Sequence, residues 1–401
     1  MIDYRSKHVN ICIRFGQLPE SSSNNMAELM ACLRGWHVGL ATAEIEALAP
    51  QTKFQAISPR LLASSSQLKP AELHQIISCS SGVQCFLNDY VSIDLEQETV
   101  EELLEKATQM IRDANFKGSL AVRTMRIDGR INDFSTQSTA GKIGSIAVAE
   151  QFTIDLENPE FEIGLIADGG SNIVACGWLV GNFDDSIGTA NRRATERPFF
   201  RPISLDPRLA RLAVNLACGP IDKRTVLDPM TGTGGFAVEA VMMGRRCIAV
   251  DMNQEMVDGT TENIVWALQG KTPKNDFHVL TGDACELPKT IDDSWHGQIS
   301  GIVLDPPYGR NSHGSQSHYD LISKTLQSAR AIISGDAKLV LIVPIIPDKN
   351  DTGEIELLHG QWDELNQLLS DCGAAMIGQW KEHVHGSLSR LILLASIAPL
   401  N

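Results

Sequence analysis

Residues 305–308, with the sequence Asp-Pro-Pro-Tyr, combine groups that can hold an amine for reaction. They follow an apolar run at 299–304, which predicts a buried strand that ends before Asp305. Two prolines without backbone N–H groups force an extended bend, so the carbonyl oxygens of Asp305 and Pro306 face outward beside the carboxylate. These oxygens can accept both N–H bonds of an exocyclic amine, and Tyr308 offers a ring on which a base can stack. The expected chemistry is methylation of a nucleobase amino group, with orientation supplying most of the rate.

A glycine-rich loop at residues 230–235 joins a strand that ends at Asp228 to a helix that begins near Phe236. Glycines let the backbone approach a ligand closely and free the N–H groups at the start of a helix. The loop lacks both the G-x-G-x-x-G spacing of dinucleotide sites and the lysine of phosphate loops. An acidic residue before the glycines would repel a pyrophosphate but attract an amine. The predicted cofactor is therefore S-adenosylmethionine, which carries an amine, a carboxylate, a sulfonium and a ribose diol.

Two further acidic residues follow neighbouring predicted strands. Asp251 could accept hydrogen bonds from both ribose hydroxyls, and Asp283 could accept one from the adenine amine. The carboxyl ends of parallel strands meet at one edge of a sheet, where such folds bind ligands. The predicted cofactor-binding residues are Asp228, Met230, Thr231, Gly232, Thr233, Gly234, Asp251, Met252, Asp283, Ala284 and Asp305.

The elements that must position these residues alternate between short apolar strands and helices, which predicts an α/β fold with a doubly wound, mostly parallel, seven-stranded sheet. The predicted strands are 225–227, 246–250, 277–281, 299–304, 337–343, 375–380 and 388–395. The N-terminal half reads as two smaller α+β regions. The expected division is a flexible extension at 1–26, a ferredoxin-like domain at 27–95, a second domain at 96–182, a linker at 183–197 and the doubly wound domain at 198–401.

The chain has 401 residues, of which 49 are acidic and 34 basic, and its formal net charge is −15. Taken alone, this balance argues against a nucleic-acid partner. However, residues 112–142 carry a net charge of +3 and residues 192–211 one of +4, and we interpret these two basic segments as RNA-facing. The alternative is that their arginines pair with neighbouring acids at a domain interface. The predicted RNA-binding residues are Arg123, Arg126, Lys142, Arg192, Arg193, Arg197 and Arg310.

The cysteine content and the length of the apolar runs indicate the cellular compartment in which the chain is expected to work. Nine cysteines, with no C-x-x-C spacing, favour a reducing, cytoplasmic compartment and argue against a zinc ribbon. No apolar run approaches the ~18 residues of a membrane span. We expect no metal site and no membrane partner.

Several segments together give the chain a specific likeness. It resembles the archaeal tRNA guanosine-10 N2-methyltransferase family, in which a THUMP domain accompanies a Rossmann-like methyltransferase domain. The likeness covers nearly everything from about residue 28 to 394. It rests on residues 197–202 (Arg-Pro-Phe-Phe-Arg-Pro), 305–312, 383–390 (the pattern H-x-H-x-S-L-[ST]-R), 121–126 and 141–144.

The resemblance implies methylation of the exocyclic N2 of guanosine 10 in tRNA, with one or two methyl groups added. It implies that residues 96–182 form a THUMP domain that grips the tRNA acceptor end. The implied partners are tRNA and a small zinc-binding activator subunit, and we expect a monomeric chain. Asn311 and Gly386 depart from the family pattern, which has serine and arginine there. Carried over by position, the catalytic residues are Asp305, Pro306 and Tyr308, and Pro198, Phe199 and Phe200 shape the cofactor and base pocket.

Alternatives remain open from the sequence. The target could be another guanosine in tRNA or in ribosomal RNA, or the protein could be an RNA-binding or folding factor with a vestigial methyltransferase domain. His383 and His385 are interpreted as core or surface histidines rather than metal ligands. His313 and His318 are interpreted as part of a lid or solvated loop that follows the catalytic turn.

Overall fold

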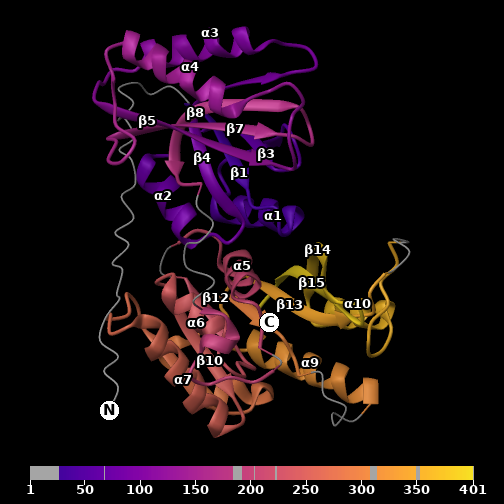
Figure 1. The fold of residues 1–401 in the computed structure, drawn as a ribbon. Helices are drawn as coiled ribbons and strands as arrows, with labels where there is room; N and C mark the ends of the chain where they lie inside the picture. Colours follow the sequence, from indigo (N-terminus) through magenta and orange to yellow (C-terminus); the bar gives the residue numbers. More distant parts are fainter. Residues whose placement is uncertain are drawn as a thin grey trace, which may run out of the picture. The chain divides into compact units, whose positions relative to one another are not determined.

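The computed structural model describes residues 27–66, 68–183, 192–202, 204–221, 224–307, 314–348 and 353–400. The chain forms two compact units (Figure 1). Unit 1 consists of Met1–Cys32, Phe54–His74 and Gln84–Phe183. Unit 2 consists of Leu33–Lys53, Gln75–Val83 and Asp184–Asn401.

Unit 1 is organised around an eight-stranded sheet in the order β2-β3-β1-β4-β8-β7-β5-β6. The antiparallel pairing of β4 with β8 joins the strands of the two predicted N-terminal domains into this single sheet. Consequently, the sheet runs across the predicted boundary between 27–95 and 96–182 without a break. The strands are β1 Ala27–Leu33, β2 Gln55–Ala56, β3 Leu61–Ser66, β4 Val83–Asp94, β5 Ser119–Ile127, β6 Thr153–Ile154, β7 Phe161–Asp168 and β8 Ile173–Gly181.

Helices α2 (Pro70–Cys79), α3 (Val100–Arg112) and α4 (Thr136–Ala149) accompany this sheet. Helix α3 begins with a capping box, in which the Thr99 side chain accepts from the backbone N–H of Glu102 and the Glu102 carboxylate accepts from that of Thr99. This reciprocal pair satisfies two N–H groups that the first turn would otherwise leave unpaired. The apolar face of α3 then packs with α4 over the sheet, with Leu103, Ile111 and Ile143 fully buried.

Unit 2 contains a seven-stranded sheet in the order β11-β10-β9-β12-β13-β15-β14. Strands β9 to β13 pair in parallel, whereas β15 runs antiparallel to both β13 and β14. The predicted doubly wound α/β sheet of seven strands is therefore confirmed. The strands are β9 Thr225–Asp228, β10 Arg246–Asp251, β11 Phe277–Thr281, β12 Ile299–Leu304, β13 Ala337–Ile345, β14 Ala374–His385 and β15 Leu388–Ile397.

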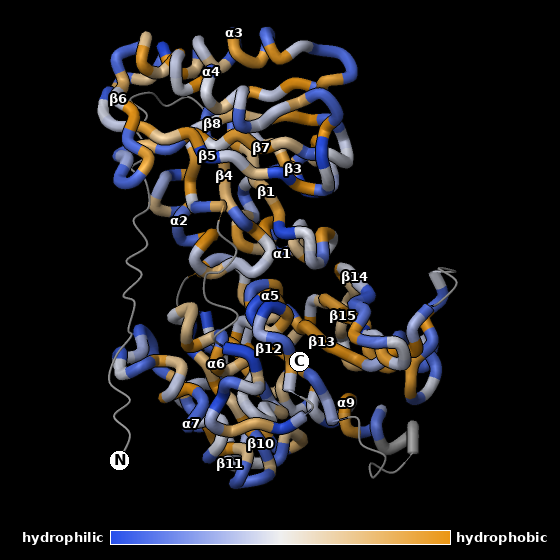
Figure 2. Tube along the Cα trace, in the orientation of Figure 1, coloured by the Kyte–Doolittle hydropathy of each residue, from blue (hydrophilic) through white to orange (hydrophobic). Residues whose placement is uncertain are grey.

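Helices cover both faces of this sheet, which explains why its central strands are continuous apolar runs in the sequence. On one face, Ile302 and Leu341 pack against Ile322 and Leu326 of α9. Figure 2 shows hydrophobic residues along most of β13 and β15. No helix of the described residues is long and apolar enough to cross a membrane. The helices are α1 Val38–Leu48, α5 Pro207–Cys218, α6 Gly235–Met242, α7 Gln254–Leu268, α8 Leu287–Thr290, α9 Gly314–Arg330 and α10 Trp362–Asp371, with single 3-10 turns at Ala194–Glu196, Ala284–Glu286 and Asp293–Trp295.

Helix α1 packs on α5 and belongs to unit 2, although the sequence places it in the first predicted domain. The reason is a buried carboxylate on α1. Glu44 is fully buried and accepts hydrogen bonds from the backbone N–H groups of Ser81 and Gly82, at 3.1 and 2.7 Å, and from the Asn215 side chain on α5, at 2.7 Å. The hydroxyl of Ser80 donates to the same carboxylate. These bonds fasten the segment 80–82 and α1 to the helix that precedes β9.

Replacing Glu44 by alanine would leave these buried donors without an acceptor. We expect Glu44→Ala to lower the free energy of unfolding of unit 2 by about 2–4 kcal/mol. Urea denaturation followed by circular dichroism measures this change. The matched control is Glu46→Ala on the exposed side of the same helix, which should stay within about 0.5 kcal/mol of the wild type. Equal effects of the two substitutions would contradict the assignment.

Candidate functional site

Three acidic side chains come together at the carboxyl edge of the unit 2 sheet. Strand β9 lies between β10 and β12 and pairs in parallel with both. Asp228 ends β9, Asp251 ends β10, and Asp305 follows β12 directly. The order of the strands thus places the predicted cofactor acids and the predicted catalytic aspartate at adjoining strand ends. Asp283 lies one strand further along, after β11, and is exposed.

The glycine loop between β9 and α6 is held open by specific backbone contacts. Gly232 and Gly234 have positive φ angles of 52° and 79°, which favour glycine. The N–H of Gly232 donates to Oδ2 of Asp251 at 2.9 Å, and the Thr260 hydroxyl donates to the Gly232 carbonyl at 2.9 Å. A Cβ atom at Gly234 would lie 2.7 Å from Cγ2 of Thr260, whereas one at Gly232 would meet nothing within 4 Å. The loop is therefore packed at Gly234 and open toward a ligand at Gly232.

Asp228 is the most unusual group of this site. Its side chain is 1% exposed, and neither carboxylate oxygen has a hydrogen-bond partner of normal length among the described residues. Burial, together with the nearby charges of Asp251 and Asp305, raises the pKa of Asp228 to about 7, although the Thr231 hydroxyl and the Met230 backbone lower it in part. The hydroxyl of Thr231, 6% exposed, is near enough to lower the pKa of this carboxylate but makes no hydrogen bond of normal geometry among the described residues. A buried acceptor of this kind fits a ligand with a cationic amine.

The predicted segment 198–200 is tied to the glycine loop by a buried asparagine that sequence reasoning missed. Asn263 on α7 accepts from the Phe199 N–H at 3.0 Å and donates to the carbonyls of Phe199 and Thr233, at 2.8 and 2.9 Å. The Phe199 ring lies so close to α7 that a Cβ atom at Gly259 would be 2.2 Å from it. The only sequence signal is the four-residue spacing of Gly259 and Asn263, which puts both on one helix face.

The other predicted cofactor residues lie around the same edge. Asp283 uses Oδ1 to accept from the backbone N–H of Cys285 at 2.8 Å, while Ala284 is buried. Met252 is 78% exposed directly after Asp251, which is unusual for a large apolar side chain. Pro198 and Phe200 are also exposed. These side chains surround open space beside the loop and can contact a bound ligand.

The predicted catalytic turn is described as far as Pro307. Asp305 is half-buried, Pro306 is buried and Pro307 is exposed. The predicted site residues Tyr308 and Arg310 lie outside the described residues, as does His313.

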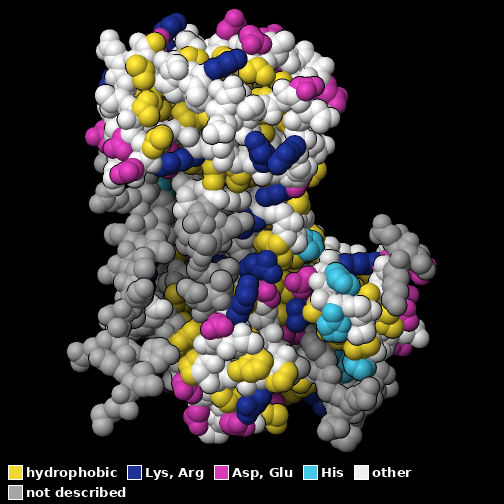
Figure 3. Space-filling model, viewed as in Figure 1, with side chains coloured by type: hydrophobic (Ala, Val, Ile, Leu, Met, Phe, Trp, Pro, Cys, Tyr) yellow, Lys and Arg dark blue, Asp and Glu magenta, His cyan; other side chains and the backbone are white. Residues whose placement is uncertain are grey.

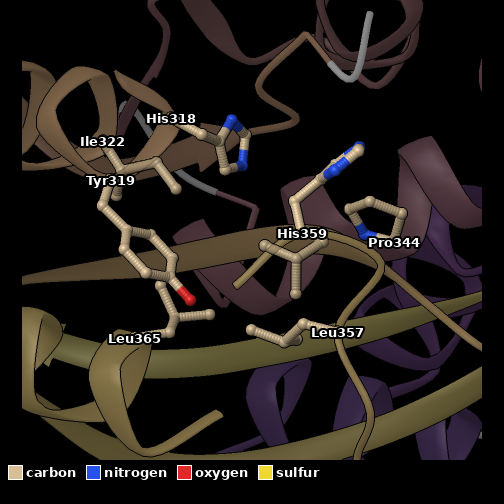
Figure 4. A pocket seen from close by; sticks show the side chains of 8 residues that line it. His318, Tyr319, Ile322, Pro344, Leu357, His359 and Leu365 are labelled. Carbon is tan, nitrogen blue, oxygen red and sulfur yellow. The ribbon is translucent and has the colours of Figure 1, made fainter. Parts of the chain in front are cut away.

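A small pocket lies beside the carboxyl end of β13 (Figure 4). Its walls include His318 and Tyr319 of α9, Pro344 of β13, and Leu357 and His359 of the following segment. The imidazole rings of His318 and His359 face the same space, with their centroids 6.4 Å apart.

The interpretation of His318 as part of a solvated loop or lid was wrong. The residue lies inside α9 and is 7% exposed, because α9 begins at Gly314 and packs this side chain toward β13. Burial lowers the pKa of His318, and the neighbouring His359 lowers it further. The His318 side chain therefore lines the pocket, where its charged form is disfavoured.

Two of the predicted RNA-binding arginines are partly or fully withdrawn from solvent in unit 2, since Arg192 is partly buried and Arg197 is buried. Glu239 on α6 is fully buried between Arg192, at 2.8 Å, and Arg211, at 2.7 Å. Burial alone would raise the pKa of Glu239, but the charges of these two arginines hold it below its ordinary value. Arg197 is 4% exposed, and burial lowers its pKa. This burial and pairing disfavour an RNA-facing role for Arg192 and Arg197, which stays a prediction, whereas Arg193 is exposed.

The predicted basic residues of unit 1 also differ from one another. Arg123 and Arg126 are three residues apart on β5, whose register with β7 is continuous, so their side chains point to opposite faces of the sheet. Arg123 pairs with Glu162 at 2.7 Å, while the exposed Arg126 donates to the Thr136 hydroxyl at the start of α4 at 3.0 Å. Lys142, also on α4, is half exposed. A shared RNA-facing surface can thus include Arg126 and Lys142 but not Arg123.

Comparison with known proteins assigns the family. Residues 194–345 match the model of the RMKL-like methyltransferase domain. A tRNA (guanine(10)-N2)-dimethyltransferase of Methanothermobacter thermautotrophicus is 31% identical over 245 residues, which are 61% of this chain and 68% of that protein. The chain belongs to the tRNA (guanine(10)-N2)-dimethyltransferase family.

Two further comparisons accompany this match. The tRNA (guanine(10)-N2)-dimethyltransferase of Pyrococcus abyssi is 32% identical over 199 residues, covering 50% of this chain and 52% of that protein. The chain thus spans about half the length of this family member. The crystal structure of TrmN from Thermus thermophilus has a TM-score of 0.46 and 18% identity, covering 92% of this chain and all of that one.

The raised pKa of Asp228 predicts how stability depends on pH. Between about pH 4 and pH 7 the unfolded chain releases this proton while the folded chain keeps it, so the free energy of unfolding falls as pH rises. Asp228→Asn removes the ionisation and should gain stability relative to the wild type over this window. The gain should reach at most about 4 kcal/mol at pH 8. Urea denaturation of both proteins from pH 4 to 8 measures the difference, and a difference that does not change with pH would contradict the assignment.

Proposed function

We propose that this chain transfers methyl groups from S-adenosylmethionine to the exocyclic N2 of guanosine 10 in tRNA. The observation that carries the proposal is the buried carboxylate of Asp228 at the end of β9, which has no hydrogen bond of normal geometry among the described residues and lies directly beside the Asp-Pro-Pro turn that follows β12. The Asp228 carboxylate can bind a cationic amine. The Asp-Pro-Pro turn offers oxygen atoms that can accept hydrogen bonds from an amino group. Membership of a family named for this reaction supports the same assignment.

The residues of the edge fit the proposed cofactor. The Asp228 carboxylate and the Thr231 hydroxyl have unsatisfied capacity for the cofactor's ammonium group. Asp251 is held by the Gly232 N–H, so its carboxylate is oriented toward a ribose diol. Asp283 and Met252 are exposed and available for the adenine. When bound, S-adenosylmethionine supplies an electrophilic methyl group on a sulfonium.

The chain's own contribution to the reaction is to hold the guanine amine. The guanine N2 lone pair is delocalised into the ring, so the amine is a weak nucleophile. The Asp305 carboxylate and the carbonyl of Pro306 accept its two N–H bonds, which favours a pyramidal nitrogen aimed at the methyl group. Tyr308 stacks on the base. Because the amine becomes more acidic as the methyl group arrives, orientation supplies most of the rate and no strong base is required.

One experiment tests the proposal directly. The purified chain alone is incubated with isotope-labelled S-adenosylmethionine and unmodified tRNA, and the modified nucleotide is mapped by nuclease digestion and mass spectrometry. The expected product is N2-methylguanosine or N2,N2-dimethylguanosine at position 10. Methylation of a different guanosine would show that position 10 is not the target. No methyl transfer in the presence of bound cofactor would favour an RNA-binding factor with a vestigial methyltransferase domain.

Asp305 should matter for methyl transfer much more than for cofactor binding. We expect Asp305→Ala to lower kcat by about 100- to 1000-fold or more, because the amine loses its charged acceptor. The dissociation constant of S-adenosylmethionine, measured by calorimetry, should change by less than about fivefold. Asp293→Ala provides a control, since Asp293 is 97% exposed away from this turn. Near-normal turnover by Asp305→Ala would show that Asp305 is not a catalytic residue.

The exposed cations of unit 1 should contribute to tRNA affinity. Charge reversal by Arg126→Glu together with Lys142→Glu should raise the dissociation constant for tRNA at least about tenfold and leave cofactor affinity unchanged. Arg123→Glu is the comparison on the same strand, and it should affect tRNA binding less because Arg123 already pairs with Glu162. Fluorescence anisotropy with labelled tRNA measures both. An equal loss of tRNA affinity from Arg123→Glu alone would show that RNA contacts the face of the sheet that carries Arg123.

A further inference from the structure

The hairpin formed by β14 and β15 places its turn at the catalytic edge of the unit 2 sheet. Strand β13 runs parallel to β12, and its carboxyl end at Ile345 pairs with Ser389 at the start of β15. The residues that connect β14 to β15 therefore project from the same edge as the turn at Asp305. The proposed function assigns no role to this hairpin, although residues 383–390 are one of the segments on which the family resemblance rests.

The end of the hairpin is built to present imidazoles outward. His383, Val384 and His385 are all exposed, and the register with β15 shifts between His383 and His385. Such bulges commonly re-aim side chains next to active sites. Nδ1 of His385 lies 3.4 Å from the Ser387 backbone N–H and 3.2 Å from its hydroxyl. Because the backbone N–H can only donate, Nδ1 is an acceptor, and the ring proton is on Nε2, directed away from the turn.

The charge of this segment contrasts with that of the whole chain. The chain carries 49 acidic residues, yet none lies between Glu382 and the C-terminus. Glu382 itself is neutralised by Arg390, whose guanidinium lies 3.3 Å from its carboxylate. Figure 3 shows histidine side chains gathered over the region of β14 and β15. The hairpin end thus offers N–H donors on a segment, 383–400, that carries no acidic residue of its own.

The rest of the outer edge of β14 is partly covered within unit 2. His37, which caps the start of α1, contacts the Lys381 carbonyl through Nε2 at 3.0 Å. Lys381 in turn pairs with Asp348 at 3.3 Å. These contacts stop before Glu382, so residues 383–387 remain accessible to a partner.

We infer that His383 and His385 bind the phosphate backbone of the RNA beside the target nucleotide. This inference rests on the proposed function. A nucleotide that is rotated out of its stack needs its flanking phosphates held, and phosphate contacts set the position of the substrate without reading its sequence. Imidazole N–H groups at the rim of the catalytic edge can make those contacts, and the serine hydroxyls of the same turn can add to them. These residues position the substrate and take no part in the methyl transfer.

The test combines His383→Gln with His385→Gln in the full chain. The double variant should raise both the dissociation constant and the KM for tRNA at least about fivefold. Its kcat at saturating tRNA and its affinity for S-adenosylmethionine should stay within about twofold, which separates positioning from a general loss of structure. His278→Gln, at an exposed histidine on β11 at the other margin of the sheet, is the matched control. Unchanged tRNA affinity and KM in the double variant would overturn the inference.

A second variant adds a charge to the same turn. A Cβ atom at Gly386 would meet nothing within 4 Å, and the residue is exposed, so a longer side chain can start there and extend into solvent. If RNA phosphates approach this turn, Gly386→Arg should tighten tRNA binding and steepen the dependence of log K on log salt by about 0.9. An unaltered salt slope would overturn the inference. The absence of methyl transfer by the wild-type chain would instead overturn the proposed function, so the two failures are distinguishable.

Discussion

A buried carboxylate without a protein partner determines the organisation of the catalytic edge. Asp228 cannot carry its charge at 1% exposure unless a cation or a proton joins it. The N–H of Gly232 in the adjoining glycine loop donates to Asp251. The loop is held in that arrangement by Thr260 and Asn263 of α7. The surrounding protein thus keeps Asp228 unsatisfied in the isolated chain, which is the state that a cationic ligand can stabilise most.

A second buried acid limits how the basic segment 192–211 can act. Glu239 forms ion pairs with Arg192 and Arg211. Two more arginines of the segment are also paired, Arg208 with Asp206 and Arg201 with Glu255. Net charge counted along a segment overlooks partners that come from elsewhere in the chain. The alternative reading, in which these arginines pair with neighbouring acids, is the one that the geometry favours for most of this segment. Its arginines hold the start of unit 2 together instead of forming a broad cationic surface.

The sequence was most informative for the short strands that alternate with helices in unit 2. The predicted strands 277–281 and 299–304 match β11 and β12 residue for residue, although β12 is almost fully buried and β11 is an edge strand with partly exposed side chains. The strand-end acids were also found, since the position of a residue in a parallel strand fixes its edge. Asn263 was missed because one polar residue on an amphipathic helix gives no signal of its buried partners. The pairing of β4 with β8, and the opposite faces of Arg123 and Arg126, depend on tertiary pairing and register.

These charge assignments alter the expected character of RNA binding. Each phosphate contact by a cation contributes about 0.9 to the salt slope, so a chain whose arginines are largely paired should bind RNA with a shallow dependence on salt. The acidic surface then restricts where RNA can bind, because carboxylates repel the phosphates of an approaching duplex. The segment after Glu382 carries no acidic residue of its own, and its start lies at the edge that holds Asp305. Hydrogen-bond donors on such a segment suit this protein better than a dense cationic patch would, because most cations of residues 192–211 already have carboxylate partners.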